Sequence, residues 1–247
     1  FLHQDKVKDR KYGEITLLQN KGTKELAIFR EAIYNYEKDF EKEIAYLRVR
    51  QKLSHPNLIK IFTFESGCQE STNMFQSHIS ILAEYSESDL EKDIKQRKKN
   101  TSYYSEEQVW FLLDSAVRAL SLLQKNNIVH GNIELSSILI MKNGSYKILE
   151  PKAYGVILTG YQIKLRDLTN PEVFLSPIQV ESLAKGVVKP IHNAWKSDVF
   201  ALGMLILEVC SLASSADIYD WKTMQIDKNL LRSRLESVKF RYSEKFS

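Results

Sequence analysis

Residues 128–140 read Ile-Val-His-Gly-Asn-Ile-Glu-Leu-Ser-Ser-Ile-Leu-Ile, a polar stretch that ends in an apolar run. The dipeptide Asn143-Gly144 follows, and a second apolar run covers residues 146–149. Asn-Gly between two such runs predicts a β-hairpin. A histidine next to an apolar run is usually a buried, hydrogen-bonded residue, so we expect His130 to have a structural role.

The composition of the 247 residues indicates a globular protein with a substantial core. Hydrophobic residues make up 43% of the chain and charged residues 27%, which excludes a disordered protein and a membrane protein. The longest purely apolar run, residues 199–207, is too short to span a bilayer and predicts a buried helix. We therefore expect one large domain or two lobes, without membrane association.

Charge and cysteine content restrict the partners and the compartment. The formal net charge is +4 and the basic residues are scattered, so we expect no nucleic-acid partner. Cys68 and Cys210 cannot form a disulfide framework, and no zinc pattern accompanies them. These features favour a reducing, cytoplasmic location. The chain lacks an initiator Met and a secretory signal, which suggests an internal piece of a longer protein.

The first third of the chain reads as a small sheet with one helix. Apolar residues near helical spacing predict a helix over residues 36–53, which must end before Pro56. Residues 65–77 are polar and rich in turn-forming residues, and we expect a surface connection there. Period-two alternation predicts strands that include residues 12–18, 26–29, 58–64 and 78–83.

The remainder of the chain is mainly helical. Ser105 and Gln108 form a capping box, and the apolar residues behind it predict a long helix. Residues 150–196 contain four prolines and little periodicity, so we expect loops with short helices. A buried helix is expected to begin near Asp198.

This order of elements predicts an α+β fold with two lobes. Five strands and a helix come first, in a small antiparallel sheet lobe over residues 1–83. A larger and mainly helical lobe follows over residues 84–247. A ligand cleft is expected between the two lobes.

Several motifs, in this order, resemble the eukaryotic protein-kinase fold over nearly the whole chain. Residues 128–140 are similar to the kinase catalytic loop, and residues 230–243 to the helix that follows the long central helix. After that helix the resemblance implies two more helices. The other matching motifs are Tyr12-Gly13-Glu14-Ile15, Leu26-Ala27-Ile28-Phe29, His55-Pro56-Asn57-Leu58, Leu82-Ala83-Glu84-Tyr85, Phe174-Leu175-Ser176-Pro177 and the run from Lys196 to Gly203.

The resemblance places non-kinase residues at the positions that carry the chemistry. Phe29 falls on the phosphate-binding lysine and cannot neutralise phosphate. Asn132 falls on the catalytic aspartate, and an amide cannot act as a general base at neutral pH. Glu134 replaces the lysine that follows, and Ser137 replaces a metal-binding asparagine. The resemblance therefore implies a pseudokinase that is not an enzyme.

The other charged residues of the implied cleft are either substitutes for the kinase groups or ordinary surface residues. The helix glutamate that normally pairs with the lysine falls on Glu43, with Glu41 as the alternative. Lys8 and Arg10 stand where the first two glycines of the phosphate loop would be. Lys8, Arg10 or Arg30 could serve as a substitute cation, but we expect solvent-facing strand residues.

The metal-binding motif is implied at residues 150–152, or at residues 153–155 in a shifted register. Glu150 and Ser137 are weak candidates for magnesium ligands, because a hard cation prefers several oxygen ligands. Pro151 fixes its own φ and keeps the preceding residue extended, which argues against a switching motif. The site would be about two charges more negative than that of a kinase, so we expect no ATP or magnesium cofactor.

The structural residues of the resemblance are retained. Asp198 is expected to anchor the backbone of the catalytic loop to the central helix, and His130 matches a packing position. Ile178 stands in place of a conserved-motif glutamate after residues 174–177. The candidate residues of the cleft are Gly13, Ala27, Ala83, Glu84 and Tyr85.

The leading functional hypothesis is a non-catalytic protein-binding or scaffolding module in a larger protein or assembly. A nucleotide-binding switch without phosphotransfer is the alternative, and a divergent active kinase is the third hypothesis. We expect protein partners, for which a large cytoskeletal assembly is a guess. The basic residues of 92–99 could meet an acidic partner such as a tubulin tail, or could form a solvated helix end.

Overall fold

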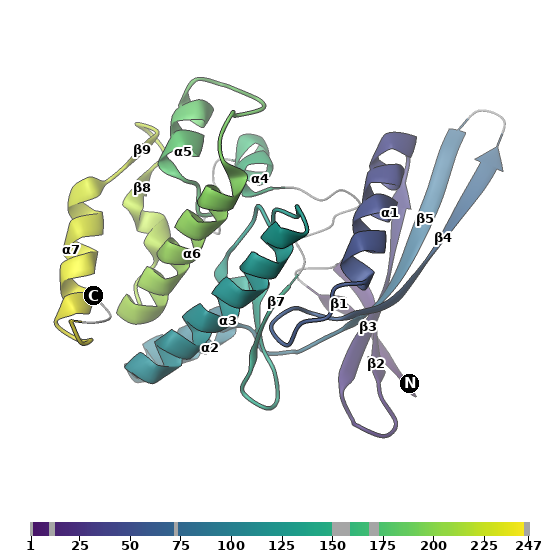
Figure 1. Ribbon diagram of the computed structural model, residues 1–247, viewed down its shortest axis with the longest axis horizontal. Helices are drawn as coiled ribbons and strands as arrows, with labels where there is room; N and C mark the ends of the chain where they lie inside the picture. Colours follow the sequence, from purple (N-terminus) through teal and green to yellow (C-terminus); the bar gives the residue numbers. More distant parts are fainter. Residues whose placement is uncertain (1, 10–12, 72–73, 150–158, 168–172, 245–247) are drawn as a thin grey trace.

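The computed structural model describes residues 2–9, 13–71, 74–149, 159–167 and 173–244. A small lobe built on a five-stranded sheet lies beside a larger helical lobe (Figure 1). The strands are β1 (Leu2–Asp9), β2 (Gly13–Gln19), β3 (Leu26–Tyr34), β4 (Ile61–Ser71) and β5 (Met74–Glu84), in the antiparallel order β1-β2-β3-β5-β4. The expected α+β, two-lobed fold is confirmed.

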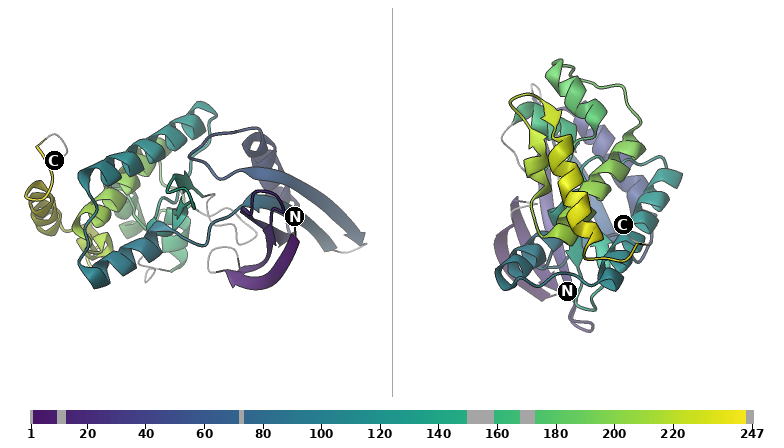
Figure 2. Two further views of the ribbon diagram at one scale, coloured as in Figure 1. Left: turned by 90° about the horizontal axis from the view of Figure 1, so that it is seen from below. Right: turned by 90° about the vertical axis from the view of Figure 1, so that its left-hand side faces the viewer.

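One helix packs on the sheet, and the other helices form the second lobe. The helix of the sheet lobe is α1 (Glu37–Gln51), close to the expected 36–53. The second lobe contains α2 (Leu90–Asn100), α3 (Glu106–Lys125), α4 (Gly160–Arg166), α5 (Pro177–Ala184), α6 (Ala194–Ser211) and α7 (Lys228–Lys239). Both views in Figure 2 place α7 at the end of this lobe that is far from the sheet.

Short elements connect these helices. A 3-10 turn, η1 (Leu135–Ser137), leads into the hairpin of β6 (Ile138–Ile140) and β7 (Tyr146–Ile148), as the Asn-Gly turn predicts. A second 3-10 turn, η2 (Ser215–Ile218), precedes the small ladder of β8 (Tyr219–Asp220) and β9 (Gln225–Ile226).

The prediction of a surface connection over residues 65–77 is wrong. β4 and β5 continue into this segment, and their register runs from Ile61↔Ala83 to Ser71↔Met74. The two strands extend beyond the end of β3 and away from the helical lobe (Figures 1 and 2). A two-stranded ribbon without a covered face needs no apolar alternation, so its sequence resembles that of a loop.

β1 also has no counterpart in the sequence prediction. It pairs with β2 at the edge of the sheet, and its residues 5–8 are exposed. An edge strand that is open to solvent carries a polar sequence, here rich in lysine and aspartate. The alternation that predicts strands is therefore absent from it.

Local signals fix the helix starts. Ser105 accepts the N–H of Gln108, and the Gln108 side chain accepts the Ser105 N–H, which confirms the predicted capping box. The helix expected near Asp198 begins four residues earlier, because Asn193 caps it by accepting the Lys196 N–H.

Each lobe has its own apolar core. In the helical lobe, α3 and α6 supply many of the buried side chains, including Leu112 and Leu205. In the sheet lobe, α1 packs on the sheet, and Leu139 and Leu149 reach this core from the other side of the cleft. The hairpin β6–β7 and its flanks therefore join the lobes. Among the described residues, no helix is both long enough and apolar enough to cross a membrane.

Candidate active site

Asp198 holds the backbone of the loop that follows α3. This aspartate lies in the second turn of α6, and its two carboxylate oxygens accept the N–H groups of His130, at 3.0 Å, and Gly131, at 2.7 Å. Burial raises the pKa of Asp198 to about 6, although the two N–H groups act in the opposite direction. This contact is the anchoring role that the resemblance implies for Asp198.

His130 is a buried, neutral residue. Its Nδ1 accepts the N–H of Asn132 at 3.2 Å, so Nε2 carries the proton and donates to the Leu149 carbonyl at 2.8 Å. Burial lowers the pKa of His130 to about 4, and the charge of Arg50 lowers it further. The imidazole therefore fixes the loop against the strand end at Leu149.

Three of the substituted catalytic-loop residues are buried as well. The hydroxyl of Ser136 donates to the Glu134 carboxylate at 2.8 Å, and the hydroxyl of Ser137 donates to the Glu134 carbonyl at 2.6 Å. Within the described part of the chain, the side-chain oxygen of Asn132 has no hydrogen-bond partner, although only 4% of the residue is exposed. The Ser137 hydroxyl, in contrast, is already engaged.

The described residues contain no cluster of three or more His, Cys, Asp or Glu side chains that could hold a metal ion. Several of the expected metal-site features lie outside the described residues. They are the implied motif at residues 150–152, its alternative at 153–155, Pro151 and the candidate ligand Glu150. Ser137 is therefore the one proposed metal ligand that the structure places.

Arg30 is buried beside Phe29, the residue that the resemblance places at the lysine position. Side chains alternate along β3, and Ile28, Arg30 and Tyr34 are buried on the face that packs against α1. Phe29 points to the opposite face and is half-buried. Arg30 is 8% exposed, so the expectation that it faces solvent is wrong, and it lies one residue after the position that the resemblance gives to the lysine.

The helix partner of this cation is Glu43. Glu43 is 3% exposed, whereas Glu41, the alternative, is exposed to solvent. Burial raises the pKa of Glu43, and the positive charge of Arg30 lowers it in part. Of the other substitute cations, Lys8 is exposed on β1, and Arg10 lies outside the described residues.

The candidate hinge residues are joined to the helical lobe by an ion pair. Lys147 on β7 donates to both carboxylate oxygens of Glu84, at 2.7 and 2.8 Å. The N–H of Tyr85 donates to the Leu26 carbonyl at 3.1 Å, which ties the segment after β5 to the start of β3. Sequence reasoning missed Lys147, because nothing local relates residues that are 63 positions apart.

The remaining cleft candidates have small side chains. Ala27 and Ala83 are buried, and Ala83 lies directly across the β3–β5 ladder from Ile28. Gly13 has a φ of +75°, a conformation that favours glycine, and a Cβ at this position would meet no atom within 4 Å. Of these three residues, only Gly13 therefore has open space around the position of its missing side chain.

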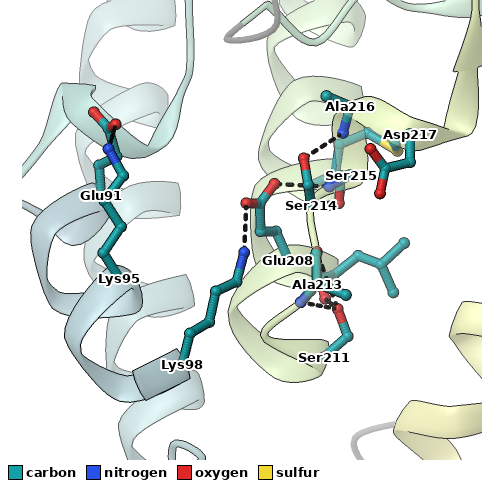
Figure 3. Close-up of polar contacts among 12 residues, drawn as sticks. Glu91, Lys95, Lys98, Glu208, Ser211, Ala213, Ser214, Ser215, Ala216 and Asp217 are labelled. Atoms are coloured by element: carbon teal, nitrogen blue, oxygen red, sulfur yellow. Dashed lines mark hydrogen bonds and ion pairs between the residues drawn. The ribbon is translucent and has the colours of Figure 1, made fainter. Parts of the chain in front are cut away.

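The basic residues of α2 are largely paired with acids. Lys95 contacts Glu91 one turn away, and the Arg97 Nε lies 2.9 Å from Asp93. Figure 3 shows Lys98 reaching across to Glu208 on α6, at 3.9 Å. Each of these three basic residues of α2 therefore has an acidic partner, which reduces the basic surface that the sequence of the helix suggests.

Comparison with known proteins agrees with this architecture. The family model for the protein kinase domain matches residues 11–245. Serine/threonine-protein kinase Nek2 of Mus musculus is 21% identical over 94% of the chain, and serine/threonine-protein kinase Nek3 of Oryza sativa is 23% identical over 89%. The human TBC domain-containing protein kinase-like protein is 24% identical over 72%.

The chain spans only part of each of these relatives. It covers 51% of the mouse Nek2 sequence, 35% of rice Nek3 and 19% of the human TBC domain-containing protein. A kinase-like domain of this size therefore occurs within longer proteins of different make-up.

These relatives contradict the prediction that the chain is not an enzyme. Two of them carry the name serine/threonine-protein kinase and match about nine-tenths of the chain. The prediction rests on single positions, and beside one of these, Phe29, the neighbouring Arg30 supplies a buried cation. The match of the family model over nearly the whole sequence, together with the two-lobed fold, shows that this chain belongs to the protein kinase family.

Proposed function

We propose that this protein kinase family member binds a nucleotide in the cleft between its lobes, with Arg30 as the cation that contacts the phosphates. The observation that carries this proposal is the buried pair of Arg30 and Glu43 on the face of β3 that packs on α1. A guanidinium presents several donors in a fixed plane and can bind phosphate oxygens in pairs. A cation of this kind is what nucleotide phosphates require.

The surroundings of the pair support this proposal. Glu43 balances the charge of Arg30 in the unliganded protein and orients it, as expected for a buried ion that must not stand alone. Ala83 lies directly across from Ile28, on the same face as Arg30, and has a small side chain. Arg30 also restores the positive charge that the assignment of Phe29 removes, which weakens the electrostatic argument against nucleotide binding.

The test measures the affinity of the protein for ATP and ADP, with and without Mg²⁺, by isothermal titration calorimetry. Arg30→Ala should weaken binding by about tenfold or more, because it removes hydrogen bonds from a charged donor. Lys8→Ala is the matched control, since Lys8 is exposed on the same sheet and should leave the affinity unchanged.

Arg30→Ala could also weaken the fold, so a second variant separates the two effects. Arg30→Lys keeps one positive charge beside Glu43, and should keep the fold and part of the affinity. Equal affinities of the wild type and Arg30→Ala would disprove the role of Arg30. No binding of either nucleotide at millimolar concentration would disprove the proposed function.

A second candidate function is a protein-binding module of the cytoplasm, within a larger protein or assembly. It is supported by the small share that the chain covers of its relatives, down to 19% in the human TBC domain-containing protein. Cys68 and Cys210 are free thiols, as expected in a reducing compartment. The paired charges of α2 argue for a contact surface elsewhere.

Cross-linking mass spectrometry of the expressed protein tests this second candidate. Deleting the domain should remove a defined set of partners, while Arg30→Ala should retain that set. An unchanged set after the deletion would contradict the module, and loss of the set in Arg30→Ala would make binding of the partners depend on the nucleotide site.

A further inference from the structure

A cavity of about 230 Å³ lies beneath the catalytic-loop backbone, on the side of α6. Its walls come from residues 129–133, the start of α4, the start of α5, the segment 188–192 and the first turns of α6. This cavity differs from the proposed nucleotide site, because Arg30 and Glu43 belong to the other lobe and do not line it.

The wall nearest the catalytic loop contains an acceptor without a donor. The side-chain oxygen of Asn132 is fully buried, and among the residues that the structure describes it has no hydrogen-bond partner. It lies beside Gly160, another wall residue, at 3.1 Å from the position that a Cβ there would take. A buried carbonyl oxygen without a donor is costly, so this position favours a ligand that supplies one.

A chain of hydrogen bonds assigns the protons on the opposite wall. Gln179 Oε1 accepts both the N–H and the hydroxyl of Ser176, each at 3.0 Å. Because the Ser176 proton is used there, the contact of 3.0 Å with Ser197 must use the hydroxyl proton of Ser197. Ser197 then accepts from Nδ1 of His192 at 2.8 Å, and in the tautomer with the proton on Nδ1 the other ring nitrogen, Nε2, is an acceptor.

Asp198 adds a third acceptor between these two walls. Each carboxylate oxygen accepts one backbone N–H and keeps a further lone pair, and the residue lines the cavity. The remaining lining is mostly apolar, with Ile133, Phe174 and Leu175 among its buried members. Lys189 lies exposed at the mouth, where solvent screens its charge.

We propose that this cavity is a binding site for a small organic cation, with an amidinium or ammonium head on a compact apolar body. Asn132, His192 and Asp198 all line the space, and each carries an acceptor that matches a donor of such a head. The apolar wall matches the body, and the volume suits a single ring or a short chain.

Benzamidine and benzoate test the chemistry, since they share a ring and differ in the head group. Benzamidine should bind to the wild type, as measured by calorimetry and by ligand-observed NMR. Benzoate, which has only acceptors, should bind about tenfold or more weakly. Equal binding of the two compounds, or no binding of benzamidine at 10 mM (about the weakest affinity of interest), would overturn the proposal.

Two tryptophan substitutions test the location. Val188 lines the mouth and is 66% exposed, so Val188→Trp should abolish benzamidine binding by filling the entrance. Ile191→Trp is the matched control, because Ile191 is 95% exposed in the same segment and does not line the cavity. If both variants bind as the wild type does, the compound sits elsewhere and the site is disproved.

Asn132→Leu tests the unpartnered oxygen. It preserves the approximate volume and removes the acceptor, so benzamidine should bind several-fold more weakly while the melting temperature is maintained or raised. Unchanged benzamidine affinity in this variant would contradict the role of the Asn132 oxygen.

Discussion

Two buried carboxylates, one in each lobe, meet the cost of burial in different ways. Asp198 in the helical lobe and Glu43 in the sheet lobe are 5% and 3% exposed. Asp198 accepts two backbone N–H groups and holds a loop in place. Glu43 lies close enough to Arg30 for the positive charge to lower its pKa in part. The first carboxylate is stabilised by backbone hydrogen bonds, and the second by the charge of a side chain.

The largest effect should follow from removing the acid of the helical lobe. Asp198→Ala leaves two buried N–H groups without an acceptor, which should lower the free energy of unfolding by about 4 kcal/mol. Urea denaturation measures this loss. The control is Asp217→Ala, since the Asp217 side chain is 64% exposed and its removal should cost less than about 0.5 kcal/mol. Similar losses of stability in both variants would show that the buried Asp198 contributes no more than an exposed aspartate does.

The pair of the sheet lobe should behave differently when both partners are removed. Glu43→Leu alone leaves the buried charge of Arg30 uncompensated and should cost about 3 kcal/mol, whereas Glu43→Leu with Arg30→Met should return close to wild-type stability. A double-mutant cycle by urea denaturation measures the coupling. Additive losses in the double variant would show that the two side chains do not act as a pair.

The pH dependence of stability should separate Asp198 from its neighbour His130. Burial raises the pKa of Asp198 to about 6, so its contribution to stability is present at low pH and is lost as the pH rises through 6. Burial lowers the pKa of His130 to about 4, so its contribution is present above about 6.5 and is lost as the pH falls through 4.

In the wild type these two contributions oppose each other between pH 4 and 6. In Asp198→Asn the histidine contribution remains, so the free energy of unfolding should rise by about 3 kcal/mol from pH 4 to pH 6.5 relative to the wild-type profile. Urea denaturation at a series of pH values measures it. Parallel profiles would mean that Asp198 titrates normally.

A smaller effect is expected at the contact that joins the lobes. Lys147→Met removes both bonds to Glu84, and should cost about 1 kcal/mol because the pair is largely shielded from solvent. Lys185→Met removes an exposed pair within α5 and its cap, and should cost about 0.3 kcal/mol. Thermal denaturation compares the two, and equal shifts would deny a special role to the contact between the lobes.

The smallest effect is expected on α2. Lys95→Met removes a pair with Glu91 on one exposed helix face, and should change stability by about 0.3 kcal/mol, less at high salt. Thermal denaturation at low and high salt measures it. A loss above about 1 kcal/mol would place Lys95 among the residues that hold the lobe together.

Features that depend on neighbouring residues along the chain could be predicted from the amino-acid sequence. The Ser105–Gln108 capping box, the Asn143-Gly144 hairpin and the long apolar helix are local patterns, and the structure contains all three. The order of these patterns was enough to predict two lobes. Polar strands such as β1 and the outer parts of β4 and β5 carry no such pattern, because no core covers them.

The contacts between polar groups of different elements could be seen in the tertiary structure alone. On β3 the packing of α1 buries Arg30 near Glu43, whereas the neighbouring Phe29 points to the other face of the strand. Lys147 contacts Glu84, although the two residues are far apart in sequence. The residues that line the cavity beneath residues 129–133 also come from distant parts of the chain. The spacing of residues along the chain determines turns and the faces of helices. Whether a charged side chain is buried or exposed depends on how the elements pack against each other.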